Sequence, residues 1–143
     1  MLDLTAADYA GYAESRLTRA RRRFDLTESQ SYTERRGELA QIASLVWDAT
    51  IDMVSALALL NGVALTGRSS DMSDYAKRRL PDAYMDWPGP ARLHNFQHKP
   101  NHPEPRFQLA CRRAGSVLSL LNQQLPAHLQ LTSECWEWLA RPA

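Results

Sequence analysis

The feature that most constrains this chain is a run of apolar side chains over residues 33–61 that recur every three or four positions. This spacing places them on one face of an α-helix. At roughly 1.5 Å per residue the helix spans about 40 Å, the length of a small bundle. Other apolar residues widen the stripe, so the helix needs partners on more than one side. The stripe contains Leu39, Ile42, Ala43, Val46, Trp47, Val54, Leu57 and Leu60, and Leu45, Ile51, Met53, Ala56 and Leu59 widen it.

Capping residues, glycines and prolines mark the ends of this helix and of five others. Thr33 and Thr5 are predicted to cap the starts of the central and first helices, and Gly62 to end the central one. No segment alternates apolar and polar residues as a strand does. We therefore predict an all-α fold: one domain over residues 1–143, an up-and-down bundle with two or three long helices and short accessory helices. The core covers about residues 5–125 and a short C-terminal helix lies within 126–143; the other predicted helices cover 5–24, 70–80, 90–98, 107–125 and 133–141.

Charge and cysteine usage narrow the function classes. Lys and Arg number 17 against 16 Asp and Glu, and this net charge of +1 excludes a globally basic nucleic-acid binder. Any site for a polyanion must be local. Cys111 and Cys135 belong to no CxxC pair, so reduced thiols and a cytoplasmic location are expected. The N-terminus lacks a signal-peptide pattern, and Asp48 and Asp52 interrupt the apolar helix, so we expect no membrane span.

Residues 91–99 are the only short stretch that gathers an arginine, two histidines and a carboxamide. Arginine grips phosphate, and histidine gains or loses a proton near neutral pH, so the combination suits phosphodiester cleavage. The candidate catalytic residues are Arg92, His94, Asn95 and His98. The plainer interpretation is that they are solvated residues of a helix.

Helix geometry sorts these side chains into two sets. Arg92 and His98 are six residues apart, so they project about 120° away from each other. They meet on one phosphate only if the first turn is irregular or a second subunit completes the site. His94 and His98 share a face, and Asn95 lies three residues from both Arg92 and His98.

Two alternatives use the acidic and imidazole groups differently. His94 and His98 have the spacing of a helical metal pair. His102 could join them as a third ligand or contact the substrate, although a loop histidine flanked by prolines is more often solvated. However, the residues between the two histidines include no carboxylate base, unlike the HExxH motif. Asp48 and Asp52, one turn apart, could form a carboxylate pair facing the site, although a solvated or capped polar stripe is the favoured interpretation. We therefore assign no metal and no cofactor.

The order of these segments resembles the HEPN domain family. The resemblance covers about residues 5–125. It rests on four segments in order: the long helix with its short sequence motifs at 45–49 and 56–62, a short helix, the Arg92-Leu93-His94-Asn95-Phe96-Gln97-His98 segment and a closing long helix. HEPN domains are small helical bundles, usually dimeric. Many are metal-independent endoribonucleases marked by an arginine followed, four to six residues later, by a histidine.

The resemblance implies that Arg92 binds phosphate and His98 is the catalytic histidine of a metal-independent endoribonuclease. RNA would be the substrate, and a homodimer would form the cleft. Asn95 would hold the phosphate or orient His98, and His94 could supply a second proton-transfer group. Such a nuclease is expected to be a toxin or defence effector restrained by an antitoxin or regulatory partner. The alternative is a non-catalytic HEPN-like module that binds a protein or nucleotide, which Leu93 and Pro100 favour.

Overall fold

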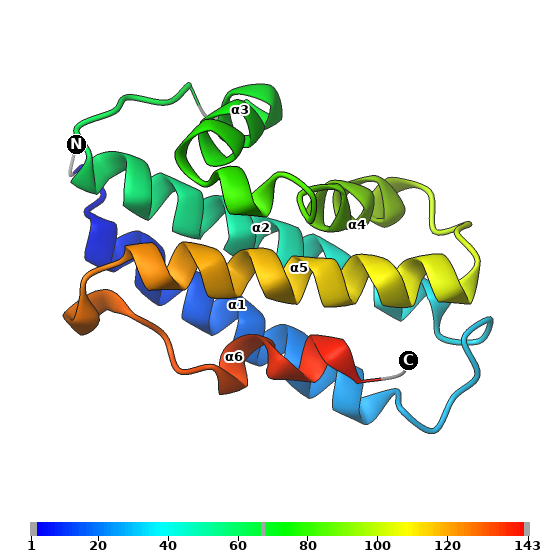
Figure 1. The fold of residues 1–143 in the computed structure, drawn as a ribbon. Helices are drawn as coiled ribbons and strands as arrows, with labels where there is room; N and C mark the ends of the chain where they lie inside the picture. Colours follow the sequence, from blue (N-terminus) through cyan, green and yellow to red (C-terminus); the bar gives the residue numbers. More distant parts are fainter. Residues whose placement is uncertain (1–2, 67, 142–143) are drawn as a thin grey trace.

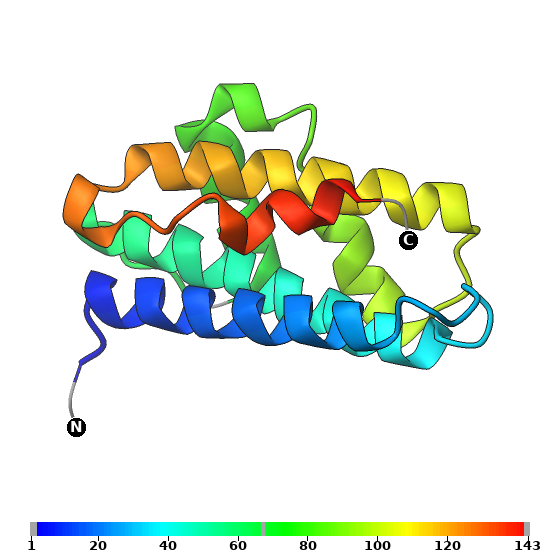
Figure 2. The same cartoon turned by 90° about the horizontal axis from the view of Figure 1, so that it is seen from below.

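The computed structural model describes residues 3–66 and 68–141. The predictions that include residues 1–2, Gly67 and 142–143 lie outside the described residues. Three long helices run alongside one another (Figures 1 and 2), and no strand occurs in the described part of the chain, so the all-α prediction is confirmed. The α-helices are α1 (Ala6–Leu26), α2 (Arg36–Leu60), α3 (Ser69–Arg79), α4 (Pro88–His98), α5 (Glu104–Gln124) and α6 (Glu134–Glu137), and the 3-10 turns are η1 (Pro81–Ala83), η2 (Ala127–Leu129) and η3 (Trp138–Ala140).

Helix α2 is the centre of the bundle, as its apolar stripe predicts. It packs against α1, α3, α4 and α5. Residues all around it are buried, including Leu39, Val46, Ala49, Met53 and Leu57. By length and composition α2 is also apolar enough to cross a membrane, but 72% of its most apolar stretch is buried inside the bundle. A core helix passes the same test of composition, so the finding does not point to a membrane.

The predicted cap of the first helix is confirmed, and the predicted cap of the second is wrong. The Thr5 hydroxyl accepts a hydrogen bond from the Asp8 amide, and the Asp8 carboxylate accepts one from the Thr5 amide. Helix α2 starts at Arg36, after a turn, and Thr33 does not cap it. Its end is as predicted, because Asn61 is the C-cap and Gly62 adopts a positive φ of 68°.

A long-range contact explains the late start of α2. The Tyr32 hydroxyl donates a hydrogen bond to the backbone oxygen of His102, 2.7 Å away. The Tyr32 ring packs on Phe107 of α5 with ring centroids 5.9 Å apart. These contacts hold residue 32 in the turn that joins α1 to α2, so the local capping signal of Thr33 is overridden.

Helix α4 starts at Pro88, before the predicted residue 90, and lies directly on α5. A Cβ atom built on Gly89 would stand 2.4 Å from the Cβ of Arg113 and 2.8 Å from the backbone of Ala110. Only glycine allows this approach of the two helices. Because α4 begins at Pro88, the segment from Arg92 to His98 forms its last two turns.

The C-terminal segment folds back on the bundle as two short pieces. Instead of the predicted single helix over 133–141, α6 is followed by η3. Trp136 and Leu139 are buried. Trp138, which the sequence pattern did not single out, packs on Phe24 of α1 with ring centroids 5.4 Å apart. Trp138 Nε1 donates to the Cys135 carbonyl, 2.7 Å away, and this bond favours the tighter turn.

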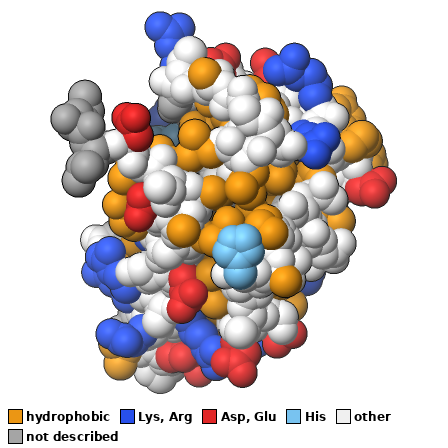
Figure 3. Space-filling view, turned by 90° about the vertical axis from the view of Figure 1, so that its left-hand side faces the viewer, with side chains coloured by type: hydrophobic (Ala, Val, Ile, Leu, Met, Phe, Trp, Pro, Cys, Tyr) orange, Lys and Arg blue, Asp and Glu red, His pale blue; other side chains and the backbone are white. Residues whose placement is uncertain are grey.

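The end of the bundle that carries the C-terminus of α2 is apolar. Figure 3 looks onto this end and shows hydrophobic side chains gathered in its middle, with charged groups around them. Leu4, Leu59, Leu60 and Val63 are between 37% and 47% exposed. A hollow of about 440 Å³ opens beside them, with Tyr9, Leu65 and Met72 in its wall. The motif on α4 is not part of this surface.

Substituting glycines with alanine tests the α4–α5 contact. Gly89→Ala should lower the free energy of unfolding by about 1–3 kcal/mol, because the new methyl group overlaps the backbone of α5. Gly11→Ala is the matched control: no atom lies within 4 Å of its Cβ position. In that exposed helix interior, alanine should stabilise the protein by about 0.5–1 kcal/mol. Urea unfolding measures both, and equal effects would show that α4 does not need the close approach.

Candidate functional site

His94 is held in place by the core. Its ring stacks on the indole of Trp47 in α2, with centroids 4.5 Å apart and an angle of 25° between the planes. Trp47 also meets Trp87, immediately before α4, at 6.1 Å. In addition, Gln97 Nε2 lies 2.6 Å from His94 Nδ1. If the Gln97 amide donates this hydrogen bond, Nδ1 is unprotonated and the proton of the neutral ring is on Nε2.

The surroundings of His94 favour its neutral form. Burial is the main cause that lowers its pKa, and the positive charge that His98 carries when protonated adds to this effect. The carboxylate of Asp48 acts in the opposite direction. The net pKa lies below the usual histidine value, so at neutral pH His94 can accept a proton but rarely carries one.

The structure brings His98 beside His94, as the shared helix face predicts. The ring centroids are 5.5 Å apart, and the planes are nearly perpendicular at 80°. His98 is exposed, and so is Asn95 between them. The face of α4 toward α2 therefore offers one half-buried and one exposed imidazole, a pair suited to moving protons at a bound phosphodiester.

Arg92 belongs to a different set of charges. It is half-buried, and the charge of its guanidinium, together with that of Arg106, lowers the pKa of His102. Helix α4 is a continuous α-helix from Pro88 to His98, so an irregular first turn that could turn Arg92 toward His98 is absent. Of the two predicted ways to bring Arg92 and His98 onto one phosphate, a second subunit remains.

The acidic groups of α2 do not form a pair that faces the site. Asp52 is buried and forms an ion pair with Arg16 of α1. Asp48 is half-buried, and its charge acts on both Asp52 and His94. The alternative of a carboxylate pair facing the site is therefore not supported, since the partner of Asp52 is Arg16 of α1. A solvated stripe does not describe Asp52 either, because its side chain is buried. Within the described residues, no group of three or more His, Cys, Asp or Glu side chains is arranged to hold a metal ion.

Burial of Asp52 disfavours its charged form. Desolvation raises the pKa of this carboxyl to about 6, although the hydrogen bond and charge of Arg16 act against the increase. The charge of Asp48 raises it further. The core next to the candidate site therefore holds a carboxyl group that titrates close to neutral pH.

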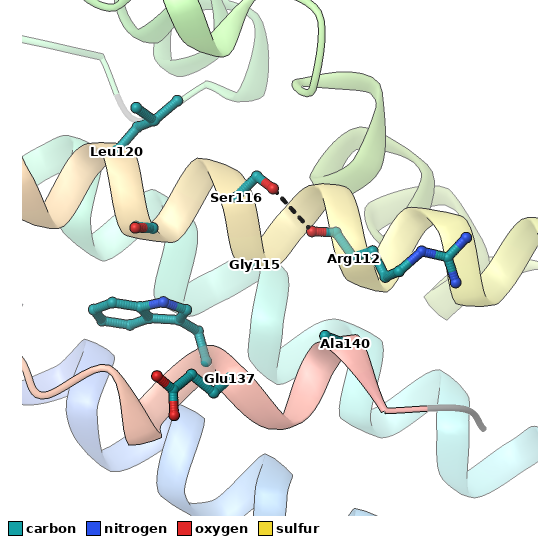
Figure 4. A pocket seen from close by; sticks show the side chains of 8 residues that line it. Arg112, Gly115, Ser116, Leu120, Glu137 and Ala140 are labelled. Atoms are coloured by element: carbon teal, nitrogen blue, oxygen red, sulfur yellow. Dashed lines mark hydrogen bonds between the residues drawn. The ribbon is translucent and has the colours of Figure 1, made fainter.

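A second hollow lies between α5 and the C-terminal turns (Figure 4). None of the predicted site residues lines it. Its volume is about 480 Å³, and residues of α5 and of the C-terminal turns line it. The Ser116 hydroxyl in its wall is bonded to the Arg112 carbonyl at 3.3 Å. The wall is formed by Arg112, Gly115, Ser116, Ser119, Leu120, Trp136, Glu137 and Ala140.

Two neighbours of the candidate site were missed in the sequence. Gln97 lies three residues after His94, and this spacing is a signal that could have identified it. Trp47 was assigned only to the core, and no local pattern links it to a histidine 47 positions later in the chain.

No family model, curated protein or solved structure matches this chain. The resemblance to HEPN domains therefore rests on the motif and on the order of the helices, and the function must be argued from the site.

The pH dependence of stability tests the environment of Asp52. Its folded pKa of about 6 lies above the ordinary value of 3.8, so between these values the folded state binds more protons. Its contribution to stability is greatest below pH 4 and is lost as the pH rises through about 6. The Asn side chain of Asp52→Asn does not titrate, so this variant does not lose that contribution. As the pH rises from 4 to 7, the unfolding free energy of wild type should therefore fall by roughly 1–3 kcal/mol relative to that of Asp52→Asn. Urea unfolding at several pH values measures this shift.

Two further variants control the Asp52 experiment. Asp74→Asn removes an exposed carboxylate from α3 and controls for the loss of one negative charge. Arg16→Gln, which keeps Asp52, should move the loss of stability to higher pH, because Arg16 lowers the pKa of Asp52. A difference between Asp52→Asn and wild type that stays constant with pH would contradict the assignment.

Proposed function

We propose that this protein is a metal-independent endoribonuclease. The observation that carries the proposal is the pair of adjacent imidazoles on α4, His94 half-buried and His98 exposed, on the same two turns as Arg92. A phosphodiester of RNA contains its own nucleophile, the 2′-hydroxyl, so cleavage needs phosphate binding and proton transfer only. The residues of α4 supply both.

In the proposed reaction, His98 takes the proton of the 2′-hydroxyl or donates one to the leaving oxygen. The 2′-oxygen attacks phosphorus, the bond from phosphorus to the 5′-oxygen breaks, and a proton reaches that oxygen. Arg92 neutralises the scissile phosphate with its guanidinium. With the Gln97 amide turned so that its oxygen accepts from Nδ1, the Nε2 atom of neutral His94 is free to take a proton, and His94 then serves as the second proton-transfer group. Asn95 orients the phosphate or His98.

The site would be shared by two copies of the chain, with Arg92 of one copy acting with His98 of the other. This arrangement is supported by the regular α4, which directs the two side chains of one copy to different sides. In its cellular role the enzyme would be a cytoplasmic toxin or defence effector restrained by a partner protein, as the resemblance implies.

One observation favours a non-catalytic binding module instead. His94 is stacked on Trp47 and bonded to Gln97, which are contacts of a structural histidine. In that case α4 would recognise a partner protein or nucleotide without cleaving it. An assay of RNA cleavage by the purified protein separates the two functions.

Removing the candidate catalytic side chains should abolish most of the activity. Arg92→Ala and His98→Ala should each reduce cleavage of RNA by roughly a hundredfold or more. Tm should stay unchanged in His98→Ala because the ring is exposed, whereas His94→Ala should lower both activity and Tm because it loses the Trp47 stack. Arg92→Lys should remain impaired, since an ammonium cannot reproduce a bidentate contact.

The controls and products make this experiment decisive. His128→Ala, an exposed histidine in η2, should cleave like wild type. EDTA should leave cleavage unchanged, DNA should survive, and one fragment should end in a 2′,3′-cyclic phosphate with a 5′-hydroxyl on the other. Full activity in both Arg92→Ala and His98→Ala would place the active site elsewhere. Loss in EDTA with recovery in zinc would support His94 and His98 as metal ligands.

Mixing inactive variants tests the shared site. Light scattering should show a dimer at micromolar concentration. When Arg92→Ala and His98→Ala proteins are mixed and exchange subunits, half of the dimers are hybrids with one intact Arg and His pair. Activity should then recover to about a quarter of wild type. An active monomer, or exchanged dimers without recovery, would show that the two residues act within one chain.

A further inference from the structure

Three arginines from three helices gather at one end of the bundle. Arg36 is the first residue of α2, Arg92 lies in α4, and Arg106 lies in the first turn of α5. The α1–α2 and α4–α5 connections lie side by side at this end, opposite the N-terminus (Figures 1 and 2). The Arg36 guanidinium lies over the Tyr32 ring, 5.6 Å from its centroid. The Tyr32 hydroxyl bonds to the His102 carbonyl at 2.7 Å and ties the two connections together.

Aromatic packing holds the His102 ring in place at this end of the bundle. It is half-buried, and its ring packs on Phe96 with centroids 5.6 Å apart and an angle of 33°. Phe96 in turn contacts Phe107 of α5 at 4.7 Å. Arg92 lies one turn before Phe96, and Arg106 directly precedes Phe107, so both arginines flank the corner that holds His102. Their charges reach the imidazole: after burial, they are the causes that lower the pKa of His102.

These cations lack carboxylate partners. Among residues 3–66 and 68–141, none of Arg36, Arg92 and Arg106 forms an ion pair, whereas Arg16, Arg23 and Arg141 each do. Glu104, the carboxylate in the same helical turn as Arg106, accepts a hydrogen bond from Gln108 at 3.4 Å. The N-terminus of α5 also has no side-chain cap. Cations held close together without a counter-ion are stabilised when an anion binds among them.

We propose that His102 and Arg106, beside Arg92, form a subsite for a backbone phosphate of single-stranded nucleic acid. The inference rests on the proposed function and extends it: the subsite holds the phosphate next to the scissile phosphate that Arg92 of the same copy binds. A single strand can bend into this corner, whereas a duplex is too stiff to do so. Arg106 is thus a binding residue with no part in proton transfer.

The experiment measures binding of a single-stranded DNA oligonucleotide, which carries the phosphates but lacks the 2′-hydroxyl and so stays intact. Arg106→Gln should weaken binding about tenfold, the size of one lost charge-assisted contact. The slope of log affinity against log salt should fall in magnitude by about 0.7, the value for one phosphate of a single strand. Arg112→Gln removes the same charge from an exposed position on α5, beside the other hollow, and should bind like wild type.

The outcomes separate the subsite from the nuclease. Equal affinity of Arg106→Gln and Arg112→Gln, or no binding by the wild-type protein, overturns the subsite whether or not RNA is cleaved. Binding that depends on Arg106 in a protein that cleaves no RNA supports the subsite and overturns the proposed enzyme. Unchanged Tm in Arg106→Gln, whose side chain is exposed, confirms that the loss of binding is not a loss of folding.

Discussion

Burial of α2 is the constraint on which the rest of the structure depends. A helix of 25 residues that is apolar nearly all around is stable in water only when other elements cover every side of it. Helices α1, α3, α4 and α5 provide that cover, and each contributes an apolar face of its own. The positions of α3 and α4 follow from this requirement, since they cover the surface of α2 that the other long helices leave open, whereas the C-terminal turns pack on α1 and α5.

The candidate site inherits its geometry from this packing. Helix α4 is fixed by two contacts of different kinds: Trp47 of α2 against Trp87 and His94, and the absence of a side chain at Gly89 where α4 meets α5. His94 therefore contributes to the core and to the site through the same ring. A residue with both roles couples stability to chemistry, because whatever shifts α2 also shifts the imidazole.

The two faces of α4 divide the charges of the motif. The face toward α2 carries His94 and His98 near Asp48, and the other side carries Arg92 near His102 and Arg106. Under the proposed function, this division means that a single copy does not place Arg92 and His98 on one phosphate, and a second copy would join the two sets.

The sequence by itself determined the helices and the central position of α2, because apolar spacing, the Thr5 cap, Gly62 and the prolines are local signals that act within a few residues. It also determined that His94 and His98 share a face, since helix periodicity alone sets that relation. Only the tertiary structure decided what those side chains touch. Tyr32 overrode the cap at Thr33, Arg16 forms an ion pair with the buried Asp52, and the ring of Trp47 stacks on that of His94. Each of these contacts joins residues more than thirty positions apart, and their energy depends on packing that no local pattern encodes.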